Sequence, residues 1–410
     1  MSNKADAGSG LFASFNNADF RAFWAGNLFS LIGSWIQQTA QGWLVFRLTG
    51  SAKMLGLVGF MGQAPLIVFG LFAGVLADRW DRRRALLVTQ VISMAQALLL
   101  AALTMSDFVR PWHVVVLALV LGAANTFDMP LRHSFLIELV GVGRVRNAIA
   151  LNSMMFNVSR MIGPALAGVL LATVGEGICF LLNGLSFCGV VWVLARLRSK
   201  QQAHVQAHEE PVLKSLREGL LFVWHRPHMR NPVLLLTLSG LVVAPVLVLL
   251  PAVAVRLLSG GPESLGVLLS SLGVGALLAA GLLAAQLYDR LLVAIGRAGL
   301  LYGAALLLVA FSRNVYVSCA GVLLAGFGAI IMAVGTNTQL QSGISGRMRG
   351  RLASLYMLSY FGLAPLGSLL LGLIADKFGI ENAILLSGLW ALLAAVWFLK
   401  QMPEMEAAEK

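Results

Sequence analysis

Charged side chains are scarce in this chain of 410 residues. They make up 12% of the sequence, whereas hydrophobic residues make up 58% and the mean hydropathy is +0.83. An average soluble domain has about 25% charged and about 45–50% apolar residues. The shortage of charge excludes an ordinary soluble domain and indicates a protein whose solvent is lipid.

Cysteine is scarce too, and histidine does not gather with other metal ligands. Cys179, Cys188 and Cys319 lie apart in apolar stretches with no CxxC spacing, so neither a disulfide framework nor a zinc site is expected. Four of the six histidines fall in one polar stretch that has no cysteine. We therefore expect no metal and no cofactor. The chain also lacks a His–Asp or Ser–His–Asp set that would come within reach, which leaves a membrane-embedded enzyme as a remote alternative.

Long apolar runs, by contrast, are abundant. A helix needs about 20 mostly apolar residues to cross a bilayer core roughly 30 Å thick. The sequence predicts about twelve such helices, near 22–46, 54–77, 85–106, 112–130, 148–173, 177–196, 233–256, 265–287, 298–312, 315–338, 353–376 and 382–400. Residues 1–17 are polar and lack the apolar core of a secretory signal peptide.

The predicted fold is an all-α integral membrane protein with two pseudo-symmetric six-helix bundles. Its predicted parts are an N-terminal tail at 1–20, a first bundle at 21–197, a linker at 198–231, a second bundle at 232–400 and a C-terminal tail at 401–410. Within the linker, residues 212–224 have helical spacing and are expected to lie along the membrane surface.

The distribution of basic residues predicts the orientation. Of the 30 Lys and Arg residues, 23 fall on the side that holds both termini, 6 fall on the other side, and Arg160 lies within a span. Cytoplasmic loops carry the excess of basic residues, so both termini are expected in the cytoplasm, with the chain in the cell inner membrane. This placement explains the net charge of +12 without any nucleic acid as partner.

The two halves of the chain share short patterns. Leu-Gly opens the second span at 55–56, and Ala-Asp-Arg closes it at 77–79. Leu-Gly at 265–266 and Tyr-Asp-Arg at 288–290 bracket the eighth span in the same way. Internal repeats of this kind are typical of transporters, in which one half rocks against the other about a site near the midplane.

The loop after the second span carries a dense basic motif. The stretch Gly74-Val-Leu-Ala-Asp78-Arg79-Trp-Asp-Arg82-Arg83-Arg84 resembles the signature G-x-L-A-D-R-x-G-R-[KR] of the major facilitator superfamily, with Asp81 where that pattern prefers glycine. The stretches Phe20-Arg-Ala-Phe-Trp24, Gln41-Gly-Trp-Leu and Asp128-Met-Pro130 further resemble the exporter branch that includes enterobactin and macrolide efflux proteins. The fourth span departs from the superfamily at Leu119, where its proton-coupling motif has arginine.

The fifth span also resembles a motif of the superfamily. Its Gly163-Pro164-Ala-Leu-Ala-Gly168 is similar to the G-P-x-x-x-G end of the antiporter motif, and Pro365 is the matching proline of the eleventh span. We expect these residues to act as hinge or packing features. A proline within a span is tolerated because neighbouring helices satisfy the backbone groups that it frees.

The resemblance implies that the basic loop latches the two sides of the transporter in the outward-facing state. Asp78 ends a helix, where a carboxylate is unfavourable unless arginines or a facing helix N-terminus offset its charge. Asp128, at the cytoplasmic end of the fourth span, is expected to pair with Arg79, Arg82 or Arg83. The predicted gating set is Gly74, Asp78, Arg79, Arg82, Arg83, Arg84 and Asp128. In the alternative, the arginines only fix the topology and contact lipid headgroups.

The first span carries a polar stripe. At about 100° per residue, six polar side chains fall within an arc of about 100°: Asn27, Ser30, Ser34, Gln37, Gln38 and Gln41. Such a stripe cannot face hydrocarbon, because each unsatisfied polar group costs several kcal/mol there. It lines a substrate cavity or, in the alternative, joins neighbouring helices by hydrogen bonds.

Arg160 is the charge that lies deepest in a span, and Asn157 precedes it by one helical turn. An arginine within a membrane costs at least about 2.5 kcal/mol and is a functional-site candidate by default. Its planar fork suits carboxylate or phenolate oxygens, which favours an anionic substrate. The alternative is that Arg160 ties helices together near Gly163 and Pro164.

These observations predict a secondary active transporter that works by alternating access. It would export a bulky amphipathic small molecule, such as a siderophore or a drug, and would be coupled to a proton gradient. An importer or a lipid flippase of the same fold is the alternative. The expected partners are the small-molecule substrate and membrane lipids, and the protein is expected to act as a monomer.

Overall fold

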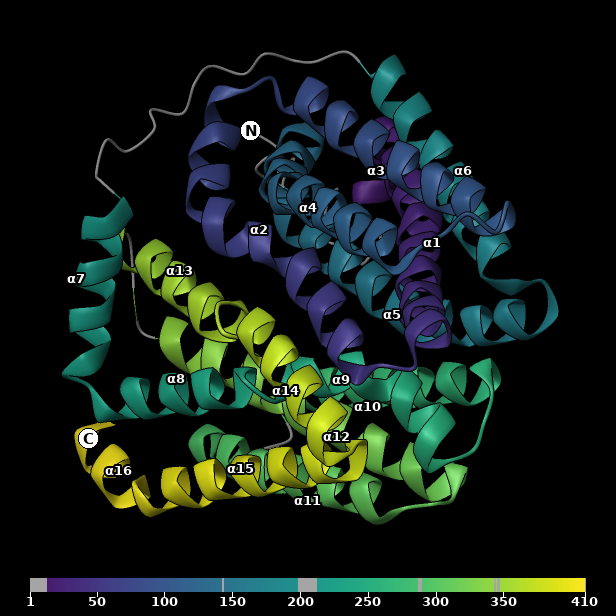
Figure 1. The fold of residues 1–410 in the computed structure, drawn as a ribbon. Coiled ribbons are helices and arrows are strands. Elements are labelled where there is room, and N and C mark those ends of the chain that lie inside the picture. The colour runs from purple at the N-terminus through teal and green to yellow at the C-terminus, as the bar shows by residue number, and fades with distance from the viewer. Residues whose placement is uncertain are drawn as a thin grey trace, which may run out of the picture. The chain divides into compact units, whose positions relative to one another are not determined.

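The computed structural model describes residues 13–141, 144–197, 212–286, 290–342, 344 and 347–409, and over these ranges it is helical with no strand. Figure 1 shows the arrangement of the helices. A short η1 at Ala13–Asn16 precedes α1 (Ala18–Thr49), α2 (Ala52–Arg79), α3 (Arg82–Met105), α4 (Pro111–Val140), α5 (Val145–Thr173) and α6 (Gly175–Arg196). The later elements are α7 (Val212–Trp224), α8 (Pro227–Gly240), α9 (Val243–Ala252), η3 (Val253–Leu257), α10 (Pro262–Ala284), α11 (Leu291–Phe311), α12 (Val315–Gln341), α13 (Arg347–Phe361), α14 (Ala364–Phe378), α15 (Ile380–Lys400) and α16 (Met402–Glu409).

The expected all-α membrane fold is confirmed. Eleven segments of the described chain are long and apolar enough to cross a membrane. The 32-residue α1 is not one of them, in keeping with its polar stripe, although it contains the predicted first span at 22–46. The predicted ninth span began too late, because α11 starts at Leu291 and includes Arg297. Arg297 is exposed, and a long basic side chain near a helix end can reach the interface.

The described residues form two compact units. Residues up to 41 and those from 62 to 197 belong to the first unit, whereas 42–61 and those from 212 onward belong to the second. α1 and α2 therefore each contribute to both units. The predicted domain boundaries stay a prediction, and they differ from this grouping at 42–61.

Two predicted spans of the second unit are interrupted helices. The seventh span consists of α8, then Leu241 and Val242, then α9 and η3, and the eleventh consists of α13, then Gly362 and Leu363, then α14. The two breaks lie together. A side-chain carbon at Gly240 would come within 3.3 Å of the Tyr360 carbonyl oxygen, and one at Gly367 would collide with the Leu241 carbonyl.

α7 has the bounds that the sequence predicts, Val212–Trp224. Figure 1 shows it running crosswise to α8, as expected for a helix that lies along a surface while its neighbours span the membrane. Arg351 of α13 forms an ion pair with Glu218 at 2.5 Å, and Val223 packs with Leu352 and Leu355 in one apolar cluster. The linker helix is thereby fixed to the second unit.

Candidate functional site

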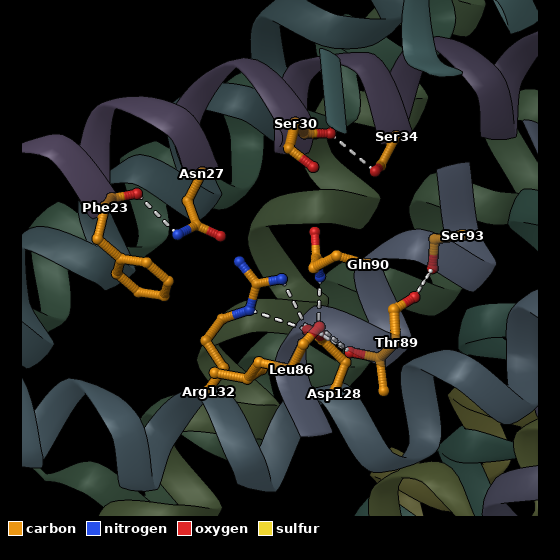
Figure 2. Close-up of polar contacts among 10 residues, drawn as sticks. All are labelled: Phe23, Asn27, Ser30, Ser34, Leu86, Thr89, Gln90, Ser93, Asp128 and Arg132. Atoms are coloured by element: carbon orange, nitrogen blue, oxygen red, sulfur yellow. Dashed lines mark hydrogen bonds and ion pairs between the residues drawn. The ribbon is translucent and has the colours of Figure 1, made fainter. Parts of the chain in front are cut away.

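A buried carboxylate lies between α3 and α4 of the first unit. Asp128 of α4 is 8% exposed, and its oxygens accept hydrogen bonds from two helices (Figure 2). Thr89 and Gln90 of α3 donate to Oδ1 at 2.9 and 2.6 Å, and Arg132, one turn further along α4, donates to Oδ2 through Nε at 2.9 Å and Nη2 at 2.7 Å. Both arginine donors meet the one oxygen Oδ2, and charge-assisted hydrogen bonds of this kind are about twice as strong as neutral ones.

The side of this cluster that faces α1 keeps unused hydrogen-bonding capacity. Asn27 Oδ1, Gln90 Oε1 and Arg132 Nη1 are buried and have no hydrogen-bond partner among the described residues. Figure 2 shows Asn27 and Arg132 turned toward one another across the space between α1 and α4, with Gln90 beside them. Buried polar atoms are normally paired with protein or water. Two acceptors and one donor are thus available here to water or to a polar ligand group.

The basic loop makes contacts other than the predicted ones. Arg82 pairs with Glu138 of α4 at 3.8 Å, and Arg83 donates to the carbonyls of Leu194 and Ala195 in α6 at 2.6 and 3.2 Å. The predicted pairing of Asp128 with Arg82 or Arg83 is wrong, because Arg132 on the same helix already occupies the carboxylate.

Asp81 replaces the glycine of the superfamily pattern for a structural reason. It is the N-cap of α3, and its side chain accepts a hydrogen bond from the backbone N–H of Arg84 at 2.9 Å. Aspartate is a preferred N-cap residue. The side chains of Asp78 and Arg79, like the surroundings of Gly74, lie outside the described part of the chain, so the remainder of the predicted gating set stays a prediction.

One edge of the polar stripe of α1 is a helix–helix seam. Gln37 is 1% exposed, donates to Gln96 Oε1 of α3 at 2.9 Å and accepts from Asn183 Nδ2 of α6 at 2.7 Å. These amides tie three helices together. The contacts of Gln37 therefore match the alternative reading of the stripe, in which its members join neighbouring helices.

The opposite edge of the stripe is open. Gln38 is exposed and Ser34 is half-buried, with its hydroxyl donating to the Ser30 carbonyl at 2.8 Å. Gln41 is 8% exposed and Asn27 is 1% exposed. The stripe thus divides along its length into a sealed side at Gln37 and an accessible side at Gln38.

α5 lies beside this part of α1. Gly163 has no room for a side-chain carbon because it packs directly on Trp35, whose ring also meets Phe156 edge-on at 5.9 Å. Asn157 and Arg160 lie between these two contacts along α5 and are half-buried. Trp24 Nε1 donates to the Leu151 carbonyl at 3.2 Å, so the contacts run in step along the two helices and Arg160 lies beside the part of α1 that precedes Trp35.

The hinge and packing residues differ between the halves. Gly163, Pro164 and Gly168 are buried within α5, which remains one continuous helix. Pro365 is buried at the start of α14, directly after a break. Whether any of these residues acts as a hinge stays a prediction.

Six residues of these polar contacts were missed in the sequence: Thr89, Gln90, Gln96, Arg132, Glu138 and Asn183. The signal for Arg132 was present, because Asp128 and Arg132 stand four apart on a helix, a spacing that brings side chains together. Among the described residues, no group of three or more His, Cys, Asp or Glu could hold a metal ion.

Solved structures similar to this chain are membrane transporters. A bacterial homolog of the human lysosomal transporter Spinster matches with a TM-score of 0.74 at 13% identity, covering 96% of this chain and 98% of the other. The nucleoside transporter NupG matches with a TM-score of 0.73 at 11% identity, covering 94% and 99%. At such identities the likeness shows the fold alone.

Curated relatives share more sequence. The staphyloferrin A transporter of Staphylococcus aureus is 27% identical, covering 90% of this chain and 92% of its own length. The multidrug efflux pump Tap of Mycolicibacterium fortuitum is 28% identical, covering 92% and 95%, and macrolide efflux protein A of Streptococcus pyogenes is 25% identical, covering 92% and 94%. The sequence profile described as transmembrane secretion effector matches residues 9–410. The chain therefore belongs to the transmembrane secretion effector family of the major facilitator superfamily and is a multi-pass membrane transporter.

Proposed function

We propose that this protein exports a bulky amphipathic small molecule from the cytoplasm by alternating access. The observation that carries the proposal is the division of the α1 stripe, in which Gln37 is sealed between helices while Gln38 is exposed. An exposed amide within a spanning helix cannot face hydrocarbon, where an unsatisfied polar group costs several kcal/mol. Gln38 therefore faces water or cargo. The efflux functions named for the relatives support the same direction of transport.

The proposed substrate surface joins α1 to α5. Ser34 and Gln38 supply neutral hydrogen-bonding groups, and Asn157 and Arg160 lie on the neighbouring α5, before its Gly163–Trp35 contact with α1. Arg160 supplies a permanent positive charge with a planar fork. The substrate class that fits is a molecule with an apolar body and a carboxylate or phenolate group, as the siderophore relative suggests.

Asp128 is the proposed proton carrier. It is the one carboxylate in the described chain that falls in the buried class, and it forms an ion pair with Arg132 at 2.7 Å. Protonation would remove one partner of a buried ion pair, a change worth several kcal/mol in the membrane interior. In the proposed cycle the released Arg132 then rearranges the contacts among α1, α3 and α4. The proposed cycle moves the substrate and includes no catalytic step.

The proposed setting is the cell inner membrane, with both termini cytoplasmic and lipid around a monomer. The basic loop then lies on the cytoplasmic side, and the Arg82–Glu138 pair at 3.8 Å belongs to the gating network there. The cluster of arginines fits the excess of basic residues that cytoplasmic loops carry.

The test is accumulation in a strain that lacks the gene, compared with the same strain carrying it. Ethidium, a macrolide and a carboxylate siderophore serve as substrates, each with and without an uncoupler. We expect the gene to lower the internal level of at least one of them about fivefold or more, and the uncoupler to remove the difference. Energy-independent equilibration of all three would contradict the proposal.

A matched pair of variants tests the substrate surface. Arg160→Gln should abolish export of the siderophore and spare ethidium, because only an anionic substrate needs the guanidinium. Arg297→Gln removes an exposed charge near the end of α11 and should change neither. Equal loss of both substrates in Arg160→Gln would contradict the anionic site.

A further inference from the structure

The turn between α1 and α2 is held by a carboxylate from the end of α14. Asp376 Oδ1 accepts a hydrogen bond from Ser51 Oγ at 2.8 Å and one from the backbone N–H of Lys53 at 3.5 Å. The first N–H groups of a helix lack partners within it and carry partial positive charge. Asp376 thus completes the N-terminus of α2 from another helix. Arg256 of η3 donates to the Gly50 carbonyl of the same turn.

Next to this contact, one turn further along α2, the backbones of α2 and α14 pack directly against each other. A side-chain carbon on Gly56 would come within 3.0 Å of Gly372 Cα and would collide with the Ser368 carbonyl. A carbon on Gly59 would come within 3.5 Å of Ser368 Cβ. Small residues at such spacing let spanning helices pack closely without a polar side chain between them. All of these residues belong to the second unit.

The contact can open without leaving its polar groups unsatisfied. Asp376 is exposed and Ser51 is half-buried, so water can take over the hydrogen bonds when the two part. The seam between the glycines leaves no buried polar side chain unsatisfied on opening. α1 and α2 run on from this contact into the first unit, so any rearrangement between the units must bend these helices or open the contact.

The sequence around Asp376 repeats that around Asp78. Gly372-Leu-Ile-Ala-Asp376-Lys377 ends α14, and Gly74-Val-Leu-Ala-Asp78-Arg79 ends α2. Since the start of α2 meets the end of α14, the two helices run in opposite directions, and their aspartates mark opposite membrane surfaces. Asp376 is on the outer surface in the proposed orientation.

We infer that Asp376 is the outer latch of the transport cycle. It holds the start of α2 against α14 while the outer side is closed, and its release lets α2 leave the Ser368–Gly372 face of α14 so that cargo can depart. This inference rests on the proposed function, because it assigns a step of the export cycle to the contact. Asp376 acts through α2 and is a positioning residue.

The test follows the reactivity of a thiol at Ser368, which is 1% exposed under α2. Ser368→Cys is made in a chain whose Cys179, Cys188 and Cys319 are replaced by alanine, and intact cells are treated with a membrane-impermeant maleimide. Added Asp376→Ala should raise the labelling rate about fivefold or more. Asp376→Asn keeps an acceptor oxygen and should raise it about twofold. Lys377→Gln, the neighbouring charge, should leave it unchanged.

A second thiol separates a latch from general loosening. Ser387 of α15 is also 1% exposed, and Ser387→Cys should stay unreactive in the Asp376→Ala chain. An unchanged labelling rate at position 368, or labelling at both positions, would overturn the inference. The assay needs no substrate, so its result does not depend on the export test. Failure of the latch inference and failure of the proposed function can therefore be distinguished.

Discussion

The two units differ in the polar side chains that bridge their helices, although glycine packs against backbone in both, as Gly122 does against Gly62 in the first unit. In the first unit, polar side chains bridge the spans, as in the Gln37–Gln96–Asn183 chain and the cluster around Asp128. In the second unit, the described contacts between α2, α8, α9 and α14 rely on glycine and on backbone, as at Gly56 and Gly367. In lipid there is no hydrophobic driving force between helices, so hydrogen bonds and close packing hold them together. Hydrogen-bonded amides fix one geometry, whereas a glycine seam can slide or part.

The matching prolines sharpen this contrast. Pro164 lies within the continuous α5, yet Pro365 follows a break between α13 and α14. Both have a glycine one to three residues earlier, so local sequence does not explain the difference. Gly163 is held by the Trp35 side chain of α1, which keeps α5 in register. The break before Pro365 instead abuts the break in the seventh span. Pro365 thus borders two interrupted helices, whereas Pro164 lies in a continuous one.

The largest expected effect comes from locking the glycine seam. Ser51→Cys with Asp376→Cys places two thiols where the native oxygens are 2.8 Å apart, and a short bis-methanethiosulfonate reagent should join them. Export of ethidium should then fall to the level of cells without the protein, because α2 cannot leave α14. Dithiothreitol should restore it.

A second pair on the same surface gives the control. Arg313 of the turn between α11 and α12 pairs with Glu381 of α15 at 2.7 Å, and cysteines at these positions should be joined by the same reagent. That cross-link should change export less than twofold. Full export by the 51–376 cross-linked protein would show that the seam is as static as the amide contacts of the first unit.

The second largest effect is expected from changes to the hydrogen-bonded cluster around Asp128 in the first unit. Asp128→Ala leaves Arg132 buried without its carboxylate, and breaking a buried pair in this way costs about 3–5 kcal/mol. We expect a lower unfolding temperature in detergent and at least a tenfold loss of export. Asp128→Asn, which keeps hydrogen bonds to Thr89 and Gln90, should retain most of the stability and still lose export.

The double variant Asp128→Ala/Arg132→Met removes both charges and should recover the unfolding temperature without recovering export. Normal export by Asp128→Asn at equal membrane abundance would mean that the carboxylate is only a structural member of the first unit. The proton-carrier proposal would then be wrong.

The sequence predicted the fold well because lipid imposes a strong pattern. Apolar length, the basic loops and the spacing at 212–224 are each set by one physical requirement, and the helices appear where these signals lie. The four-residue spacing from Asp128 to Arg132 could have been read, but its partners Thr89 and Gln90 were beyond reach because only packing brings α3 against α4. The helical arc of the α1 stripe could not reveal which edge meets α3 and α6.

The smallest effect separates those two edges. Gln37→Leu leaves the Asn183 amide and Gln96 Oε1 without their buried partner, which should lower the free energy of unfolding by about 1–3 kcal/mol while the folded protein exports normally. Gln38→Leu disturbs no packed contact, so its stability should stay within about 0.5 kcal/mol. It should instead change the apparent affinity for an exported substrate two- to fivefold, because Gln38 faces the cargo. Thermal unfolding and concentration-dependent efflux, measured on the same two proteins, decide the matter. If Gln38→Leu altered only stability, the accessible edge of the stripe would be another helix–helix contact. The stripe would then have a structural role along both edges and none in substrate binding.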